Sequence, residues 1–540
     1  MRPNLLILTL DSFRADRTSL LGYNRPTTPN LDRLAERAIV CTKTRALSCW
    51  TQPSLLTAFT SSRPFDHGGF DRGATGRPWT LFNVLSRAGY ETTAISTTPW
   101  VTPYFGYGFN REEFHFGLNA LLGCYCAPLA SYLGQTQALE YVGAMWRQMV
   151  PALEDFIEGG WDKIYRPADV LKVIWKHEGE LFSDPASYVS RWLDPPPKSH
   201  DWLGHAWRWK RPLSWLASEG ALRLGDRLTG IFDPRLASMR AYRHKRFIDG
   251  ADLADRVIAS IGTAQEPWCV WAHFHDTHMP YLAGRGPKWY RQTSEYLSRL
   301  GYSGVDVSTA VKPRPSTLKE REDWSALYDA AMLYTDEQVG RVLSALKEMG
   351  LAENTVVAIA GDHGEELGEH GDHGHHFRLY EHNVRVPMLF HAPFHKGRIV
   401  ADGLTTLLDF APTIAELCGV EEPKGWQGRH VLSLEVKARD HVLLETVYGG
   451  ACDLSFRPPY FAVCTKKFKY LWAETLDPND GLSPKSDELY RIRADPGETI
   501  NLDGTEPTGW FRGIIRARLE AIEPGLGKAR IDAALAEEKT

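Results

Sequence analysis

The chain has 540 residues, more than one hydrophobic core usually supports, so we expect one large domain and a smaller one. Its 43% hydrophobic and 24% charged residues are typical of a globular protein. A net charge of -5 lacks the basic signature of general nucleic-acid binding, and no apolar run has the length of a membrane span. We therefore expect no nucleic-acid partner and no stable membrane association.

The cysteines point to a reducing compartment. Eight of them are scattered along the chain, and only Cys124 and Cys126 lie close together, at the wrong spacing for a zinc ribbon. The apolar run from Leu5 to Leu10 is too short for a secretory leader, and Asp11 ends it. We therefore predict thiols rather than disulfides and a cytoplasmic protein.

The N-terminal segment predicts a buried strand at Asn4–Leu10 that carries Asp11 at its C-terminal end. A Thr-Pro start signal predicts a helix over Thr28–Ile39. In the next predicted helix Pro53 fits the first turn, and Thr51 lies just before it. A hydroxyl at that place faces exposed backbone N–H groups, which favour an anion, although threonine before proline is also a common helix cap.

A helix at Thr80–Tyr90 and a strand at Glu91–Ser96 continue the alternation expected of an α/β protein. From about residue 118 to 247 the sequence instead predicts a helical insertion that is rich in tryptophan and basic toward its end. We predict that this insertion covers the active-site crevice and that Trp207 and Trp209 bind the substrate. An oligomer interface is the alternative, since tryptophan is also enriched there.

The rest of the chain first resumes the alternation and then changes pattern. We predict helices and strands in chain order at Ala251–Ile261, Trp268–Phe274, about Asp323–Met349, Thr355–Ile359, Val386–Phe390 and Leu408–Leu417. Short strands separated by turns follow, which predicts a small antiparallel sheet from His441–Glu445, Tyr460–Cys464 and Phe468–Trp472. We expect a large α/β domain at residues 1–430 and a small α+β subdomain at 431–540.

The loop after the predicted strand at Thr355–Ile359 carries the adjacent pair Asp362 and His363. In an open α/β sheet, ligands bind outside the carboxyl ends of the strands, where Asp11 is also expected. Gly361 and Gly364 flank the pair and would permit the irregular turn that aims both side chains at one point. A polar loop that is merely solvated is the alternative for such a pair alone.

Ordered motifs along the chain resemble the sulfatase family of the alkaline phosphatase superfamily. They are Leu8–Asp16 with Gly22, Tyr23 and Thr27–Asn30, then Gly361–Glu366 through Val384–Pro387, and finally Phe468–Tyr470 with Asp487–Leu502. Only the insertion lies outside them. The resemblance implies an alkaline-phosphatase-like sandwich, in which a large, mostly parallel sheet lies between helices and residues 1–430 are catalytic.

The resemblance also implies one divalent metal ion held by Asp11, Thr51, Asp362 and His363, with Thr51 in the position of the nucleophile. Oxygen and imidazole ligands form a hard-to-borderline site that suits such an ion. His363 stands where many sulfatases have an amide, and Ser12 stands where many have a second aspartate. Both differences favour manganese, zinc or iron, with calcium or magnesium as alternatives.

Other roles follow from the same resemblance. His278 matches the family's substrate or leaving-group histidine, and His375 or His376 stands near a substrate-contacting Lys or His. Arg14 either contacts the anionic group of the substrate or forms a structural ion pair with Asp16. A second metal ion is an open alternative because more possible ligands lie nearby, namely His273, His275, Asp276, His370 and His373.

The nucleophile departs from that of true sulfatases. Those resemble Cys-x-Pro-Ser-Arg here, with the cysteine converted to formylglycine, whereas this chain has Thr51-Gln-Pro-Ser-Leu55 and Cys49 is two residues too early. A formylglycine hydrate releases sulfate by collapsing to the aldehyde, which a threonine cannot do. A phosphothreonine, by contrast, can be attacked at phosphorus by water or an alcohol.

We therefore predict a metal-dependent hydrolase or transferase of phosphate or phosphonate esters, similar to phosphodiesterases and phosphonate monoester hydrolases. Its substrate would be an anionic ester, and a homo-oligomer is left open. One alternative is a sulfuric ester hydrolase that works without formylglycine. The other is an inactive relative that binds only metal or substrate.

Overall fold

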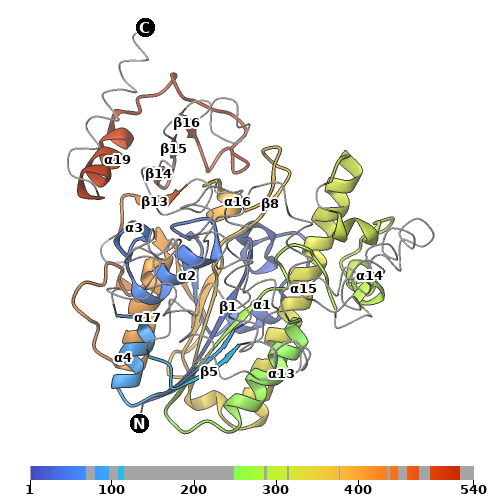
Figure 1. The fold of residues 1–540 in the computed structure, drawn as a ribbon, viewed down its shortest axis with the longest axis vertical. Helices are drawn as coiled ribbons and strands as arrows, with labels where there is room; N and C mark the ends of the chain where they lie inside the picture. The colour runs from blue at the N-terminus through green and yellow to red at the C-terminus, as the bar shows by residue number, and fades with distance from the viewer. Residues whose placement is uncertain are drawn as a thin grey trace, which may run out of the picture.

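A central sheet and a smaller second sheet organise the part of the chain that the computed structural model describes (Figure 1). That part comprises residues 2–67, 79–96, 108–114, 248–284, 289–312, 315–375, 378–433, 438–447, 459–473 and 487–522. The predicted insertion at 118–247, with Trp207 and Trp209, and also His376 lie outside these residues.

The central sheet has eight strands in the order β11-β2-β10-β7-β1-β6-β4-β5. Strand β10 runs antiparallel to both of its neighbours, and the other pairs are parallel. This mostly parallel sheet confirms the predicted fold class. Its strands are β1 (Asn4–Leu10), β2 (Ile39–Cys41), β4 (Glu91–Ser96), β5 (Arg111–Phe114), β6 (Trp268–Phe274), β7 (Thr355–Gly361), β10 (Met388–His391) and β11 (Ile399–Ala401).

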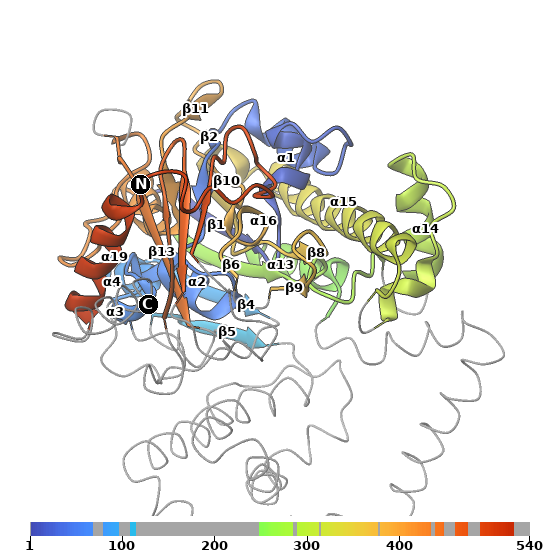
Figure 2. The same cartoon turned by 90° about the horizontal axis from the view of Figure 1, so that it is seen from above.

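Strand β1 is buried on both faces because helices cover the sheet on each side (Figures 1 and 2). Side chains alternate along a strand, so Leu6 and Leu8 pack on one side and Leu5 and Ile7 on the other. The first side is covered by α1 (Pro29–Ala35), α13 (Gly250–Ile261) and α15 (Leu318–Glu348), with α14 (Trp289–Arg299) against α15; the second is covered by α2 (Thr51–Thr60), α4 (Leu81–Arg87) and α17 (Phe410–Cys418).

Two predicted helices have different boundaries in the structure. The helix predicted over residues 28–39 ends at Ala35, because Ile39 begins β2 and pairs with β10 and β11. The long helix α15 begins at Leu318, earlier than the predicted Asp323. Thr317 caps it by accepting a hydrogen bond from the backbone of Glu320, the capping-box pattern that marks a helix start.

The predicted small antiparallel sheet is confirmed, with one more strand and a covering helix than the sequence pattern indicated. One face packs on α19 (Gly509–Ile522), and the other packs on Leu47 and Tyr380. The backbone of Glu445 donates to the carbonyl of Leu47, 2.8 Å away, in the segment that leads to α2. The boundary after residue 430 stays a prediction. The strands are β13 (Val442–Val447), β14 (Pro459–Cys464), β15 (Lys469–Ala473) and β16 (Glu488–Tyr490).

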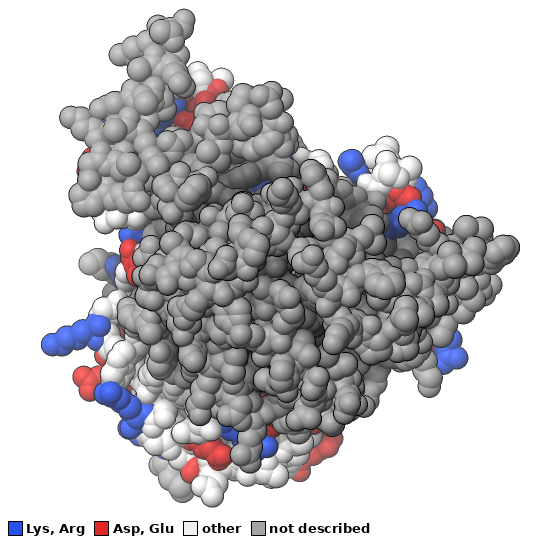
Figure 3. Space-filling model, viewed as in Figure 1, with Lys and Arg blue, Asp and Glu red and all other residues white. Residues whose placement is uncertain are grey.

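The surface and the helices agree with the composition. On the face shown in Figure 3, the described acidic and basic side chains lie interspersed around the edge, in line with the net charge of -5. Among the described helices, none has both the length and the apolar character needed to cross a bilayer.

Candidate active site and metal centre

Three neighbouring parallel strands deliver the candidate site to one edge of the central sheet. Strand β1 lies between β7 and β6, and its last residue, Leu10, stands opposite Gly361 and Phe274. Asp11 and Asp362 are the next residues of their strands. The backbone of Asp362 donates to Leu10 at 3.1 Å, and that of Asp11 donates to Phe274 at 2.8 Å, so the two carboxylates leave the sheet at the same level.

The reason for glycine at positions 361 and 364 differs from the predicted one, an irregular backbone turn. Neither Gly361 nor Gly364 has a φ in the left-handed region. A Cβ at Gly364 would instead lie 1.8 Å from the carbonyl oxygen of His382, so glycine is needed for close packing. The left-handed residue is Ser12, with a φ of 53°, and its backbone N–H donates to Asp362 Oδ1 at 3.0 Å.

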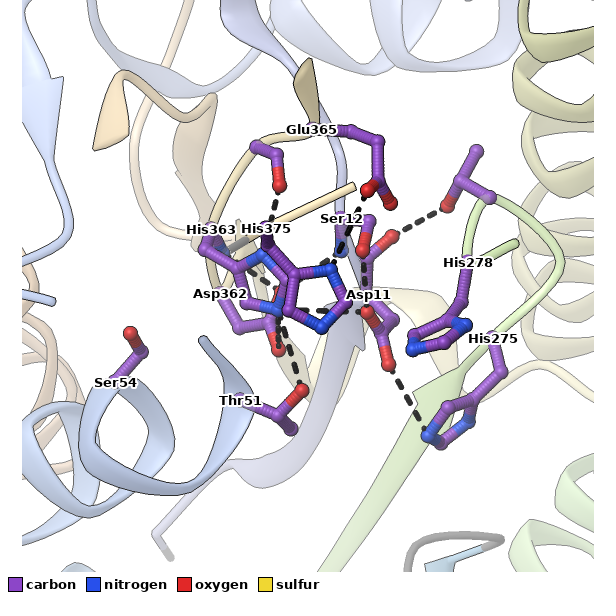
Figure 4. Close-up of polar contacts among 12 residues, drawn as sticks. Asp11, Ser12, Thr51, Ser54, His275, His278, Asp362, His363, Glu365 and His375 are labelled. Carbon is purple, nitrogen blue, oxygen red and sulfur yellow. Dashed lines mark hydrogen bonds and ion pairs between the residues drawn. The ribbon is translucent and has the colours of Figure 1, made fainter. Parts of the chain in front are cut away.

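His363 joins the two carboxylates to the predicted nucleophile (Figure 4). Its Nε2 lies 3.5 Å from Asp11 Oδ1, 3.5 Å from Asp362 Oδ2 and 3.2 Å from Thr51 Oγ1. Its Nδ1 is 2.7 Å from the carbonyl oxygen of Gly364, which can only accept a hydrogen bond. In the neutral ring the proton is therefore on Nδ1, and the lone pair of Nε2 faces the carboxylates.

These four side chains fit a divalent metal ion. Two ligands each about 2.1 Å from one ion lie about 3.0–3.6 Å apart at angles of about 90–120°, which is the spacing around His363 Nε2. Asp362 Oδ2 is buried and has no hydrogen-bond partner. The predicted ligands Asp11, Thr51, Asp362 and His363 are thus brought together, and Asp11, Asp362 and His363 form a buried group that could hold a metal ion. The identity of the metal stays a prediction.

The charges of the site are unbalanced. Burial and the negative charge of Asp11 raise the pKa of Asp362 well above its ordinary value. Burial also opposes ionisation of Asp11, but nearby histidines, first among them His278, hold its pKa well below its ordinary value. Burial and His375 lower the pKa of His363 to about 3. A divalent cation would take the place of the proton that Asp362 otherwise keeps.

Thr51 is the first residue of α2, and Trp50 occupies the cap position before it. The helix-cap alternative for Thr51 therefore does not describe this structure. Thr51 is 9% exposed and lies at the positive end of the helix dipole, where an anionic group is stabilised. Cys49, which precedes the motif, and Leu55, its last residue, are buried in apolar clusters.

His278 lies beside Asp11 on the side of the site away from Thr51 (Figure 4). Its Nδ1 is 2.8 Å from the carbonyl oxygen of Met279, so this nitrogen donates a proton to that oxygen. The ring centroid lies 5.0 Å from that of His375, in an edge-to-face arrangement. The role of His278 near a leaving group stays a prediction.

His375 is the member of the predicted His375 and His376 pair that the structure places at the site. Its ring lies 4.6 Å from that of His363, and its Nδ1 is 3.3 Å from Glu365 Oε1. Burial would lower the pKa of His375, but the Glu365 carboxylate outweighs it and raises this pKa. The sequence pattern does not indicate this pairing, although Glu365 lies in the motif that carries Asp362.

Arg14 has the structural role that was one of its two predicted alternatives. It is buried, and its guanidinium donates to both Asp16 oxygens at 2.9 and 2.7 Å. It also contacts Glu369 at 2.5 Å and the carbonyl oxygen of Glu365 at 2.9 Å. These contacts anchor the loop after β7 and engage the guanidinium edges that would otherwise bind a substrate anion.

The residues considered for a second metal ion divide into two groups. His275 Nε2 and His273 Nε2 lie 3.3 and 3.6 Å from Asp11 Oδ2 and form a second buried group with it. The other three make contacts elsewhere, with the backbone of Gly250 for Asp276, the ring of Tyr380 for His370 and the ring of Trp324 for His373.

Sequence comparison relates most of the chain to sulfatases. A family model described as Sulfatase matches residues 3–117 and 210–420, and one described as N-sulphoglucosamine sulphohydrolase, C-terminal, matches residues 368–523. An arylsulfatase of Clostridium perfringens is 28% identical over 97% of this chain and 96% of its own length. A choline-sulfatase of Rhizobium meliloti is 27% identical over 44% of this chain, and the match spans about half of that relative, 47%.

Solved structures share the fold. A protein in complex with its substrate D-glucosamine-2-N,6-O-disulfate has a TM-score of 0.59 at 17% identity, with 98% of this chain and 99% of that chain covered. The phosphonate monoester hydrolase of Agrobacterium radiobacter has a TM-score of 0.55 at 16% identity, covering 96% and 95%. Because the Sulfatase model matches more than half of its residues, the chain belongs to the sulfatase family.

Proposed function

We propose that this protein is a metal-dependent hydrolase of phosphate or phosphonate esters with Thr51 as its nucleophile. The observation that supports this most directly is the position of the Thr51 hydroxyl, at the start of α2 and 3.2 Å from His363 Nε2. The formylglycine of sulfatases derives from a cysteine at this place in the motif. Threonine cannot be converted in that way, but it can form and release a phosphoester.

The metal requirement follows from the ligand set. A divalent ion held by Asp11, Thr51, Asp362 and His363 would acidify the Thr51 hydroxyl and offset the negative charge of the ester. Manganese, zinc or iron suits a site with an imidazole ligand and a serine at position 12, and calcium or magnesium is the alternative.

The residues around the ion suggest a double displacement. Thr51 Oγ1, its proton released to water, forms a bond to phosphorus as the bond from phosphorus to the leaving oxygen breaks. His278 or His375 donates a proton to that oxygen, and Glu365 favours the protonated form of His375. Water then attacks phosphorus and gives a proton to the same histidine, while the bond to Thr51 Oγ1 breaks and this oxygen takes back a proton from water.

Sulfuric ester hydrolysis is the second candidate. The names of the arylsulfatase and choline-sulfatase relatives favour it. A Thr51 sulfate would have to be resolved by attack of water at sulfur, because threonine has no aldehyde to re-form. The third candidate, an inactive relative, is disfavoured because every ligand position holds a chemically competent side chain.

A parallel assay separates these candidates. Protein loaded in turn with manganese, zinc, iron, calcium or magnesium is given 4-nitrophenyl esters of phosphate (mono- and diester), phenylphosphonate and sulfate. We expect the highest kcat/KM on a phosphorus ester, with an acid-quenched sample showing phosphate on Thr51 by peptide mass spectrometry. A higher kcat/KM on the sulfate ester, with sulfate on Thr51, would establish the second candidate instead.

An alcohol acceptor in the same assay distinguishes hydrolysis from transfer. A transferase gives a new ester in place of free phosphate as glycerol is added, whereas a hydrolase gives free phosphate throughout. We also propose a cytoplasmic location, supported by buried thiols at Cys41, Cys49, Cys269, Cys418 and Cys464. The oligomeric state is open, and size-exclusion chromatography with light scattering measures it.

A further inference from the structure

We infer that Asp11 bridges two metal sites, and that a second divalent ion binds between Asp11, His273 and His275. Each of these three residues offers one possible ligand atom, and the three atoms lie within 4.8 Å of one another. All three side chains are buried. It shares the Asp11 carboxylate with the site at Asp362 and His363, and His273 Nε2 also lies 3.7 Å from Asp362 Oδ2.

Strand geometry explains why these histidines converge. Residues two apart in a strand point to the same side of the sheet, so His273 in β6 and His275 just after it point the same way. His273 stands opposite Thr9 of the neighbouring strand β1. Asp11 lies two residues beyond Thr9 and therefore points to that same side. A His-x-His sequence at the end of β6 thus places two imidazoles beside the carboxylate at the end of β1.

The two oxygens of Asp11 face different sets of histidines. Oδ1 is 3.5 Å from His363 Nε2, whereas Oδ2 is 3.3 Å from His275 Nε2 and 3.6 Å from His273 Nε2. Figure 4 shows His275 and His363 on opposite sides of the Asp11 side chain. A carboxylate that offers one oxygen to each side is the arrangement that bridges two ions.

The hydrogen bonds of His275 aim an acceptor at Asp11. Its Nδ1 is 3.2 Å from the carbonyl oxygen of His273, which can only accept, so in the neutral ring Nδ1 carries the proton. The lone pair of Nε2 then faces a carboxylate oxygen 3.3 Å away. A cation between these two acceptors would replace their repulsion by coordination. The backbone contact holds the ring in place, as a hydrogen bond to the other ring nitrogen does in metal-binding histidines.

A contact with β1 orients His273 in the same way, with Nδ1 as the donor and Nε2 toward Asp11. Its Nδ1 is 2.8 Å from Thr9 Oγ1, which also accepts a hydrogen bond from Trp271 Nε1 at 2.9 Å. The Thr9 hydroxyl has the carbonyl of Ala272 as an acceptor of its own, so Nδ1 of His273 can donate to Thr9. Nε2 of His273 is buried without a hydrogen-bond partner, 3.6 and 3.7 Å from carboxylate oxygens.

A pair of ions about 3.5–4 Å apart can contact both the attacking and the leaving oxygen in phosphoryl transfer. This consequence rests on the proposed function, whereas the second site itself rests only on the geometry around Asp11. Counting metal ions therefore tests the site without any substrate. Failure of the assay on phosphorus esters would leave that count unchanged.

The test is the metal content of the full chain. Metal-stripped protein is loaded with zinc or manganese, desalted and analysed by mass spectrometry for bound metal. We expect two equivalents in the wild type and one in His275→Ala, with His363→Ala losing the other equivalent. His278→Ala is the matched control: it removes an imidazole three residues from His275 but outside both ligand sets, and should keep two. A wild type with one equivalent, unchanged in His275→Ala, would overturn the inference.

Two further measurements test the inference even if His275→Ala does not fold. Manganese-loaded wild type should give the electron paramagnetic resonance signal of a spin-coupled pair, and an isolated-ion signal alone at saturation would also overturn the inference. Thr9→Val keeps both histidines but removes the hydroxyl that orients His273. It should weaken the second equivalent by about 10- to 100-fold while leaving the first unchanged. Equal weakening of both equivalents would contradict separate sites.

Discussion

Two clusters in this protein each bury a pair of carboxylates, and they differ in what faces them. In the first, the paired cluster, Glu381 and Glu498 face Arg45 and Lys469. In the second, the metal cluster, Asp11 and Asp362 face His363, His273 and His275. Within the described part of the chain, the ion-pair partners of the second pair are histidines.

The paired cluster has two buried cations, Arg45 and Lys469, for its two carboxylates. Arg45 binds both oxygens of Glu381 at 2.9 and 2.8 Å, and Lys469 Nζ lies 2.9 Å from Glu498 Oε1. Burial opposes ionisation of Glu381, but the two cations lower its pKa to about 2. Burial and the charge of Glu381 raise the pKa of Glu498. Lys469 begins β15 and Arg45 ends β3 (Thr44–Arg45), so the cluster ties the small sheet to the segment that leads to α2.

In the metal cluster, no lysine or arginine of the described residues forms an ion pair with Asp11 or Asp362. The pKa of Asp362 is raised by burial and by Asp11, and acceptor atoms of His363 and Asp362 face one another at 3.5 Å. A buried cluster whose charges already cancel is a structural element. A buried cluster with excess negative charge and acceptors at ligand spacing is incomplete until a cation binds.

The largest expected effect is a loss of activity on changing Thr51, which lies where the metal cluster meets α2. Thr51→Ala should lower kcat/KM by about 10³-fold or more, because it removes the atom that forms the covalent bond. Thr51→Ser keeps a hydroxyl and should retain part of the activity. Thr57→Ala, a buried change in the same helix, controls for damage to α2. Near-normal turnover by folded Thr51→Ala would refute the role of nucleophile.

Breaking the paired cluster should instead affect stability. Lys469→Met leaves Glu381 and Glu498 with one cation between them, and we expect a loss of about 3–5 kcal/mol in the free energy of unfolding. Urea denaturation measures it. Lys319→Met removes an exposed lysine from its pair with Asp323 and should change little. A similarly small change for Lys469→Met would mean that the paired cluster does not hold the small sheet.

Asp362→Asn should change the stability of the metal-free protein and of the metal-loaded protein in opposite directions. The raised pKa of Asp362 means that the metal-free folded state binds a proton more tightly than the unfolded state. Stability of the metal-free protein is therefore lost as pH rises through that pKa. The variant has no such loss, so without metal it should be more stable than wild type at alkaline pH.

Added metal gives the opposite ranking for Asp362→Asn. Wild type should gain stability with zinc or manganese, whereas the variant, which offers the ion one charge fewer, should gain little. Thermal unfolding at several pH values, with metal and with chelator, measures both effects. Metal-free stability that falls with rising pH equally in both proteins would show that another group carries the titration. Glu381→Gln, from the paired cluster, should be destabilised with or without metal.

The location of the metal cluster could be predicted from the sequence, because its carboxylates directly follow strands. Asp11 and Asp362 each follow an apolar run, and parallel strands bring such positions to one edge. The sequence pattern did not choose between His375 and His376 or between the two roles of Arg14, because spacing does not give side-chain direction. The pairing of Glu365 with His375 depends on how the loop after β7 folds back.

That pairing leads to a pH effect. Glu365 raises the pKa of His375, so the protonated acid persists to higher pH and is lost as pH rises through this value. Glu365→Gln should lower the pKa and move the alkaline limb of the kcat/KM profile to lower pH, with a several-fold loss of rate at alkaline pH. The profile is measured with metal held saturating. An unmoved alkaline limb would assign the proton to His278 instead.

The smallest effect concerns which metal ion the metal cluster prefers. Ser12 has a φ of 53°, a conformation that aspartate tolerates, and its Oγ lies 2.8 Å from Asp11 Oδ1. Ser12→Asp therefore adds a hard carboxylate beside the metal cluster, which should raise affinity for calcium or magnesium relative to zinc by about tenfold. Ser12→Asn has nearly the same shape without the charge, so calorimetric titration of both variants isolates the effect of the charge. If the two variants showed the same ratio of calcium to zinc affinity as wild type, residue 12 would not set the metal preference, and His363 would remain the residue that does.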